Sequence, residues 1–472
     1  MKKAWLLMAL AAVAAAGLVA HKKLAKKKLN ILIVSSCSLR RDLLGPYDPA
    51  SAPTTKTISR FGKNAFVFWN AFSEVSWSNV SGFLSKLGKE KFEASGYHAI
   101  GRPWSDEEAD MQKIKVGTPP FYFRVPEGHS APPAPGSVQQ DLDIVEERVL
   151  NRANWPFVLE VHLKFMHLPY LSPEMQILDS EGPLFEEATY AKRRIRNFLR
   201  KPRKFPEAVF LTILLGHGNR LSPEILRSLP VKFEQQVIDE LFKKKFRFYL
   251  SVLHNRELLA LWRKSPAFQR DLAVIKHYYR KRLEYFDALL GTTLNGFGDE
   301  DFLENTIVIF TGDHGEAFME HGLLAHGEAN FDEMLRFPLL VKFPGMKQAQ
   351  TITKQVHQSL LADIVEGAMD GSLNASNLEA FVEHRTSDDY ILSRNCPGDL
   401  IAIRYRNEWK LHMDLAAGTK QLFHVAVDPG ETTNVIDENP DEAARLEEFW
   451  LKAASKQRSN GMVHSCNKMP WD

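Results

Sequence analysis

The segment from Asn305 to Gly345 restricts the fold more than any other part of the chain. It begins with a run of β-branched and aromatic residues, Asn305 to Phe310, that is long enough for a buried strand. The run ends at the pair Asp313-His314, which has a glycine on each side and therefore allows a sharp turn. Because ligands of open α/β sheets bind at the carboxyl ends of strands, this pair suits a divalent metal there.

An Asp-His pair by itself is equally compatible with a capping carboxylate and a hydrogen-bonded imidazole. The surrounding string is longer, however, and contains Asp313-His314-Gly315-Glu316, Glu320-His321-Gly322, His326-Gly327 and Arg336-Phe337-Pro338-Leu339. This string resembles the metal-site signature of the sulfatase family in the alkaline phosphatase superfamily. The resemblance implies an α/β fold with a mixed central sheet, helices on both faces and a smaller C-terminal subdomain. It also implies one divalent metal (Ca, Mg, Mn or Zn) on Asp313 and His314, with His326 near the substrate.

The length and net charge of the chain limit the number of domains and the kinds of partner to expect. The chain has 472 residues, enough for one large α/β domain and a smaller part. Its formal net charge of +2 gives no reason to expect a nucleic-acid partner. Three cysteines are too few for a disulfide framework.

The N-terminus has the composition of a targeting segment. Lys2 and Lys3 precede an apolar, alanine-rich run from Ala4 to Ala20, and a basic stretch from Lys22 to Lys28 follows. A basic region before an apolar run is typical of a signal peptide. Residues 1–28 are therefore expected to be either a cleaved signal peptide or an uncleaved membrane anchor with a basic linker. Either alternative places the protein outside the cytoplasm, as a periplasmic or secreted protein or one held at the inner membrane.

The first predicted strand leads to an unusual residue. Asn30 to Val34 has the pattern of a buried parallel strand, and Cys37-Ser38-Leu39-Arg40 follows it. This exit is similar to the family's first strand, in which an Asp that binds metal stands where Cys37 stands here. A thiolate binds zinc but is a poor ligand for Ca²⁺, Mg²⁺ or Mn²⁺, so the site either takes a softer metal or binds metal weakly. A small buried Cys without a ligand role is the other interpretation.

Cys37 is not expected to become formylglycine, the modified nucleophile of many sulfatases. Leu39 occupies the place of the proline that the modification motif requires. The segment also lies on the exit of the first strand, which is not where the family carries its nucleophile.

Ser78 is the candidate nucleophile. It follows a run, Phe66 to Ser73, that resembles the family's second strand, and it matches the position of the family's Thr, Ser or Cys at a helix N-terminus. Free backbone N–H groups there favour an anionic substrate and an attacking oxygen. Val80 and Gly82 replace the Pro and Arg needed for formylglycine, so an unmodified serine is expected. The alternative is that Ser78, or Ser81, only caps the helix.

Two further residues are candidates for contact with the substrate. Trp155 to Leu163 has the pattern of a central strand, and His167-Leu168-Pro169-Tyr170 beyond it is similar to a family motif whose His contacts substrate oxygens or protonates the leaving group. An imidazole suits this task near neutral pH. Arg102, after the strand-like Gly96-Tyr97-His98-Ala99, is a weaker candidate for substrate binding.

The remaining chain divides into three parts. Residues 29–345 are expected to form the catalytic domain, with a basic helical insertion at 171–268, and residues 346–472 a C-terminal part with a small sheet. The cationic runs of the insertion are either solvated helix faces or a lid or membrane-facing surface that holds an anionic substrate. A helical stripe from Ile275 to Leu290 is predicted to face the main sheet. Residues 402–411 alternate like one half-exposed strand, and 428–435 match a structural turn signature of the family.

The resulting hypothesis is a sulfatase-like hydrolase of sulfate or phosphate esters. Ser78, activated by the metal, attacks the ester, and His167 and His326 assist. The substrate is an anionic ester that is free, glycan-linked or lipid-linked. One alternative is a transferase that moves a phospho-group onto an envelope lipid or glycan. The other is a catalytically impaired relative that acts as a binding protein, which the loss of the family's first metal Asp would favour.

Overall fold

The computed structural model describes residues 28–76, 89–100, 121–122, 155–163, 166–170, 185–235, 238–239, 246–296, 300–386, 389–395 and 399–459. Residues 1–27 of the predicted targeting segment lie outside these residues, as do Ser78 and Arg102. Within them, no helix is both long enough and apolar enough to span a bilayer.

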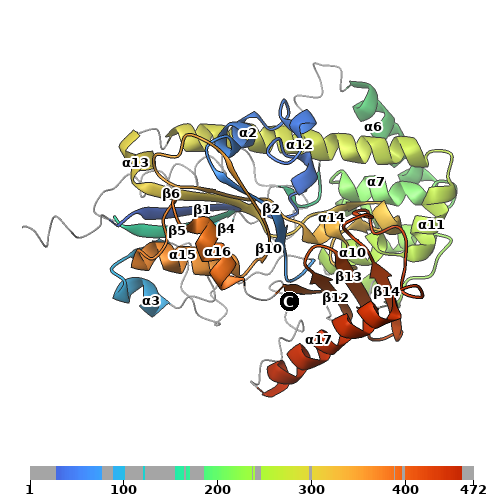
Figure 1. Cartoon of the computed structure of the whole chain (residues 1–472). Helices are drawn as coiled ribbons and strands as arrows, with labels where there is room; N and C mark the ends of the chain where they lie inside the picture. Colours follow the sequence, from blue (N-terminus) through green and yellow to red (C-terminus); the bar gives the residue numbers. More distant parts are fainter. Residues whose placement is uncertain are drawn as a thin grey trace, which may run out of the picture.

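A mixed sheet of eight described strands forms the centre of the molecule (Figure 1). Its strand order is β10-β2-β9-β6-β1-β5-β3, and β4 also pairs with β5. Only β9 runs antiparallel to its neighbours, β2 and β6. The strands are β1 (Asn30–Ser36), β2 (Phe66–Phe72), β3 (His98–Ile100), β4 (Phe121–Tyr122), β5 (Phe157–Leu163), β6 (Thr306–Gly312), β9 (Leu339–Lys342) and β10 (Gln350–His357).

The apolar residues of β1 alternate between two cores. Leu32 and Val34 pack into one cluster, whereas Ile31 and Ile33 pack into the other. All four are buried, as expected for a central strand covered on both faces. This accounts for the uninterrupted apolar run in the sequence and confirms the predicted α/β architecture.

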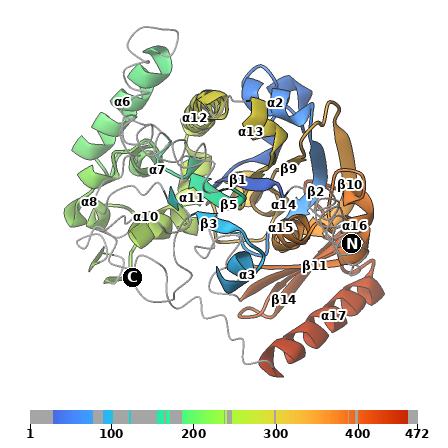
Figure 2. The same cartoon turned by 90° about the vertical axis from the view of Figure 1, so that its left-hand side faces the viewer.

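Helices cover both faces of the sheet (Figures 1 and 2). The predicted stripe on α12, from Ile275 to Leu290, is buried against one face together with Val34, Val308 and Phe310. On this side lie α2 (Lys56–Gly62), α12 (Phe268–Gly296) and α13 (Glu300–Glu304), and on the other α3 (Lys89–Ala94), α15 (Leu360–Asp370) and α16 (Leu378–Arg385).

In the described part of the region predicted to be a basic insertion, helices are joined by turns and irregular segments. A buried ion-pair cluster joins this region to α12. Nη2 of Arg194 lies 2.9 Å from Oε1 of Glu207 and 2.7 Å from Oδ2 of Asp271, which belongs to α12. Lys192, Arg193, Arg196 and Arg200 of α6 are exposed. The helices are α6 (Phe185–Arg200), α7 (Val209–Leu214), α8 (Pro223–Arg227), α10 (Phe246–Leu253) and α11 (Arg256–Lys264).

The C-terminal part contains a separate antiparallel sheet, which α17 (Pro440–Ser459) covers (Figure 1). Its strands are β11 (Tyr390–Arg394), β12 (Leu400–Tyr405), β13 (Trp409–Asp414) and β14 (Thr419–Phe423). The single strand predicted at 402–411 is wrong, because the chain turns back within it. Arg406 and Asn407 have φ values of 46° and 55°, the left-handed conformations that a tight hairpin turn between β12 and β13 requires.

A buried ionic cluster joins this small sheet to the main domain. Asp332, in α14 (Asp332–Leu335), accepts hydrogen bonds from Arg404 and, at 2.8 Å, from Nζ of Lys410. Nζ of Lys410 also lies 2.7 Å from Oε1 of Glu431, which belongs to the turn signature at residues 428–435. Burial alone would raise the pKa of Asp332, but Arg404 and Lys410 more than offset it and hold the pKa well below its usual range. The turn signature therefore has a structural role.

Candidate metal centre and active site

The site begins where two neighbouring strands end. β1 and β6 run parallel, and their register pairs Ser36 with Gly312. Cys37 and Asp313 are the next residues of the two strands, so they leave the sheet side by side at its carboxyl edge. A hydrogen bond of 3.2 Å from the backbone N–H of Asp313 to the carbonyl of Ser36 continues the pairing.

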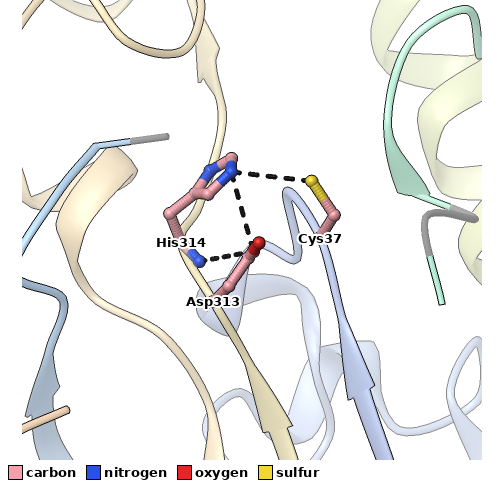
Figure 3. A group of neighbouring side chains, drawn as sticks. All are labelled: Cys37, Asp313 and His314. Atoms are coloured by element: carbon pink, nitrogen blue, oxygen red, sulfur yellow. Dashed lines mark hydrogen bonds and ion pairs between the residues drawn. The ribbon is translucent and has the colours of Figure 1, made fainter. Parts of the chain in front are cut away.

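Three side chains converge at this edge (Figure 3). Sγ of Cys37 lies 3.6 Å from Nε2 of His314, and Nε2 of His314 lies 3.6 Å from Oδ1 of Asp313. One sulfur, one nitrogen and one oxygen atom thus lie within 4.8 Å of one another. All three residues are buried, and Cys37 retains its thiol.

The orientation of His314 follows from its second ring nitrogen. Nδ1 lies 2.8 Å from the carbonyl oxygen of Gly315. A carbonyl only accepts hydrogen bonds, so Nδ1 carries the proton and, in the neutral ring, Nε2 presents its lone pair to Cys37 and Asp313. This outer hydrogen bond is the usual way in which proteins orient a histidine that binds metal.

Backbone groups hold the Asp313 carboxylate in place. Oδ1 accepts hydrogen bonds from the N–H of His314 at 2.7 Å and from the N–H of Ser38 at 3.2 Å. Gly315 permits the turn, since a Cβ there would lie 2.0 Å from the carbonyl oxygen of Glu333. The glycine after the pair is therefore required by a close approach between backbones.

His326 returns to the site through a short ribbon. β7 (Ala317–Phe318) pairs with β8 (Leu324–Ala325), which brings His326 back beside Glu316. Nδ1 of His326 lies 3.0 Å from Oε1 of Glu316, and its ring centroid lies 4.5 Å from that of His314. Burial raises the pKa of Glu316 to about 8, although His314 lowers it in part. Burial thus favours the protonated form of the Glu316 carboxyl group.

His167 completes the group on the other side of β1. It follows β5, which pairs with β1, and its ring centroid lies 5.0 Å from that of His326. It is half-buried, and its Nδ1 lies 3.0 Å from the carbonyl oxygen of Leu168. The structure thus brings together five of the seven predicted site residues, Cys37, Asp313, His314, His326 and His167. Ser78 and Arg102 lie outside the described residues.

Three supporting residues were not predicted from the sequence. Glu316 orients His326, and its place in the string beside Asp313-His314 was an available signal. Ser38 has a φ of 55°, rare for a residue with a side chain, and its Oγ lies 3.4 Å from Nδ1 of His326. Gln358 donates a hydrogen bond of 3.1 Å to the carbonyl oxygen of Asp313, a contact that no local pattern indicates.

The donor set fits a divalent cation. Imidazole nitrogen, carboxylate oxygen and thiolate sulfur are all established ligands of zinc-like metals. Cys37, Asp313 and His314 are the residues that would hold such an ion, and His326 and His167 lie beside them without being part of the converging trio.

Comparisons with known proteins show what the chain is similar to in sequence and in fold. The family model described as Sulfatase matches residues 142–371. Arylsulfatase K from Canis lupus familiaris is 28% identical over 221 residues, which cover 42% of this chain and 41% of the relative. The chain thus matches about two fifths of the length of that relative.

Two solved structures share the fold. One is a candidate sulfatase from Bacteroides thetaiotaomicron, with a TM-score of 0.57, 15% identity and coverage of 94% of this chain and 98% of that one. The other is a protein solved with its substrate D-glucosamine-2-N,6-O-disulfate, with a TM-score of 0.52, 16% identity and coverage of 94% and 100%. Residues 142–371 of the chain thus match the sulfatase family, and the relative by sequence and the solved structures described above are similar to it in sequence and fold, respectively.

Proposed function

We propose that this protein hydrolyses sulfate or phosphate esters at the edge where β1, β5 and β6 end. The observation that carries the proposal is the convergence of Cys37, Asp313 and His314 next to His326 and His167. This arrangement places a cation site and two imidazoles together at the carboxyl ends of central strands, where α/β proteins bind ligands.

A sulfated sugar is the first substrate class to test. The match to the Sulfatase family model and the similarity to a protein whose substrate is a disulfated glucosamine support it. Glycan-linked or lipid-linked esters are the second class, since α6 exposes Lys192, Arg193, Arg196 and Arg200, which would attract an anionic polymer or headgroup. The signal-like composition of residues 1–28 supports a location outside the cytoplasm.

In the proposed reaction, Oγ of Ser78 gives its proton to one of the nearby imidazoles and bonds to the sulfur or phosphorus atom. The bond from that atom to the alcohol oxygen breaks, and the alcohol leaves. His326, held by Glu316, and His167 provide the imidazoles that stabilise the ester oxygens and donate a proton to the leaving alcohol. Water then releases the anion from the serine. A divalent cation on Cys37, Asp313 and His314 would lower the pKa of a nearby hydroxyl group and polarise the ester oxygen.

The test compares Ser78→Ala with Ser81→Ala on panels of sulfate and phosphate esters. We expect Ser78→Ala to abolish turnover and Ser81→Ala, which changes the neighbouring serine, to retain it. Release of inorganic sulfate or phosphate indicates hydrolysis, whereas a modified acceptor indicates transfer. Unchanged turnover in Ser78→Ala would rule out this nucleophile.

One observation favours a second candidate, a binding protein with impaired catalysis. Cys37 stands where the resemblance places a metal-binding Asp, and its sulfur faces His314 at 3.6 Å. A protein of this kind would bind a sulfated sugar and release no sulfate. Equilibrium binding combined with a sulfate-release assay on the same ester separates the two candidates.

A further inference from the structure

We propose that the site selects a thiophilic divalent cation of the zinc class, bound by the Cys37 thiolate, the Asp313 carboxylate and the His314 imidazole. Calcium and magnesium, which prefer oxygen ligands, would bind this site more weakly than zinc does. The assignment rests on the proposed function for its location, but it is tested without turnover.

The chemistry of the donors points to zinc. Zinc accepts sulfur, nitrogen and oxygen in one site, and catalytic zinc sites commonly have three protein ligands and one open position. Calcium takes six to eight oxygen ligands, and magnesium retains an octahedral shell of oxygens. The converging trio offers one carboxylate, one imidazole and one thiol, so sulfur and nitrogen form two thirds of the donor set.

The spacing of the donors agrees with a tetrahedral ion. Zn–S bonds of about 2.3 Å and Zn–N bonds of about 2.05 Å at a tetrahedral angle place sulfur and nitrogen about 3.5 Å apart. The distance from Sγ of Cys37 to Nε2 of His314 is 3.6 Å. The corresponding spacing for nitrogen and carboxylate oxygen is about 3.4 Å, and Nε2 of His314 lies 3.6 Å from Oδ1 of Asp313.

The electrostatics of the site also favour a cation. Nδ1–H of His314 donates a hydrogen bond to the carbonyl oxygen of Gly315, so the neutral ring turns the lone pair of Nε2 toward the Asp313 carboxylate. Electron-rich atoms that converge in a buried place repel one another unless a cation or a proton lies between them. A metal ion satisfies the carboxylate, the imidazole and the thiolate together.

The trio is also fixed before any ion binds. Cys37 and Asp313 continue paired strands of the central sheet, and two backbone N–H groups hold Oδ1 of Asp313. Because the ligands are held by rigid elements, the position of the sulfur is a property of the fold and its removal has a specific effect on metal choice.

The experiment uses the full chain, stripped of metal with a chelator and titrated separately with Zn²⁺, Co²⁺, Mn²⁺ and Ca²⁺. We expect one equivalent of Zn²⁺ to bind far more tightly than Ca²⁺, and Co²⁺ to produce a thiolate-to-cobalt charge-transfer band. Cys37→Ser should abolish the band and weaken Zn²⁺ binding by more than about 100-fold, the upper end of what loss of an outer-shell partner costs. Cys396→Ser and Cys466→Ser are matched controls that should retain both properties.

Cys37→Asp gives the converse result if the assignment is correct, because it should lose the cobalt band and gain affinity for Mn²⁺ and Ca²⁺. Circular dichroism establishes that each variant is folded. A wild-type protein without the band, or a folded Cys37→Ser variant with undiminished Zn²⁺ affinity, would overturn the assignment. Tight Zn²⁺ binding without ester turnover would instead count against the proposed function alone.

Discussion

Oε1 of Glu316 lies 3.0 Å from Nδ1 of His326, and both residues are buried at the base of the β7–β8 ribbon. The carboxyl group fixes the plane of the imidazole and determines which ring nitrogen it engages. Glu316 is therefore a positioning residue in the proposed reaction, and the first prediction concerns it.

Glu316→Gln should lower kcat on the best ester substrate by about 100-fold, because an imidazole that is wrongly oriented loses most of its acid–base contribution. KM should change little, since Glu316 is not placed against the substrate. Glu328→Gln is the matched control, because Glu328 also pairs with a histidine, Nδ1 of His254 at 3.1 Å, that is not one of the five converging site residues. Steady-state kinetics on both variants checks the prediction, and equal losses in the two would contradict it.

Gly315→Ala should destabilise the protein by about 2–3 kcal/mol, since the new Cβ would overlap the carbonyl oxygen of Glu333 and force the backbone to move. Zinc affinity should also fall, because the carbonyl of Gly315 orients His314. In Gly430→Ala the nearest atom to the new Cβ would lie 3.4 Å away, so this control should change stability by less than about 0.5 kcal/mol. Urea unfolding measures both variants.

Asp332→Asn should cost about 3–5 kcal/mol, because it removes the charge that compensates buried Arg404 and Lys410. Asp389→Asn is the surface counterpart, since Asp389 pairs with Arg406 at 2.7 Å and the Arg406 side chain is 58% exposed. That change should cost less than about 1 kcal/mol. Equal midpoints of urea unfolding for the two variants would show that the buried cluster does not hold the C-terminal sheet.

Glu333 should make the protein less stable as the pH rises. Burial raises the pKa of Glu333 from 4.5 to about 8. Between these values the folded state keeps a proton that the unfolded state has lost, so the free energy of unfolding decreases with pH, by up to about 1.4 kcal/mol per pH unit.

Glu333→Gln removes this dependence, because an amide stays neutral at every pH. The two proteins should have similar stability near pH 4.5, and the variant should become progressively more stable than the wild type toward pH 8. Thermal unfolding across this range provides the measurement. Glu379→Gln, at an exposed position of α16, should follow the wild-type curve, and a constant difference between Glu333→Gln and wild type would contradict the argument.

The site contact that could be predicted from the sequence is the one that follows from the order of the strands in the central sheet. Apolar runs located the strands around Cys37 and Asp313, and parallel strands end at one edge, so the meeting of these two residues could be expected. The burial of one face of α12 was equally predictable, because the helical period places Ile275 and Leu283 on that face.

Other contacts had no signal of this kind. The turn at Arg406 and Asn407 lacks glycine, so the alternation appeared to continue through it. The ribbon that returns His326 to Glu316 has strands of only two residues, too short for a periodic pattern. Lys410 reaches Asp332 across 78 positions of sequence, and only tertiary packing determines that contact.

The place of β1 in the sheet has a consequence for how the protein is made. β1 lies between β5 and β6, and Cys37 and His314 are 277 positions apart in sequence. During synthesis, one edge of this apolar strand stays unpaired until Thr306–Gly312 has left the ribosome, which exposes the nascent chain to aggregation for most of its elongation. Zinc captured by Cys37, Asp313 and His314 together would therefore report that the strand had been inserted, and it could serve as a signal of folding in a cell-free translation reaction.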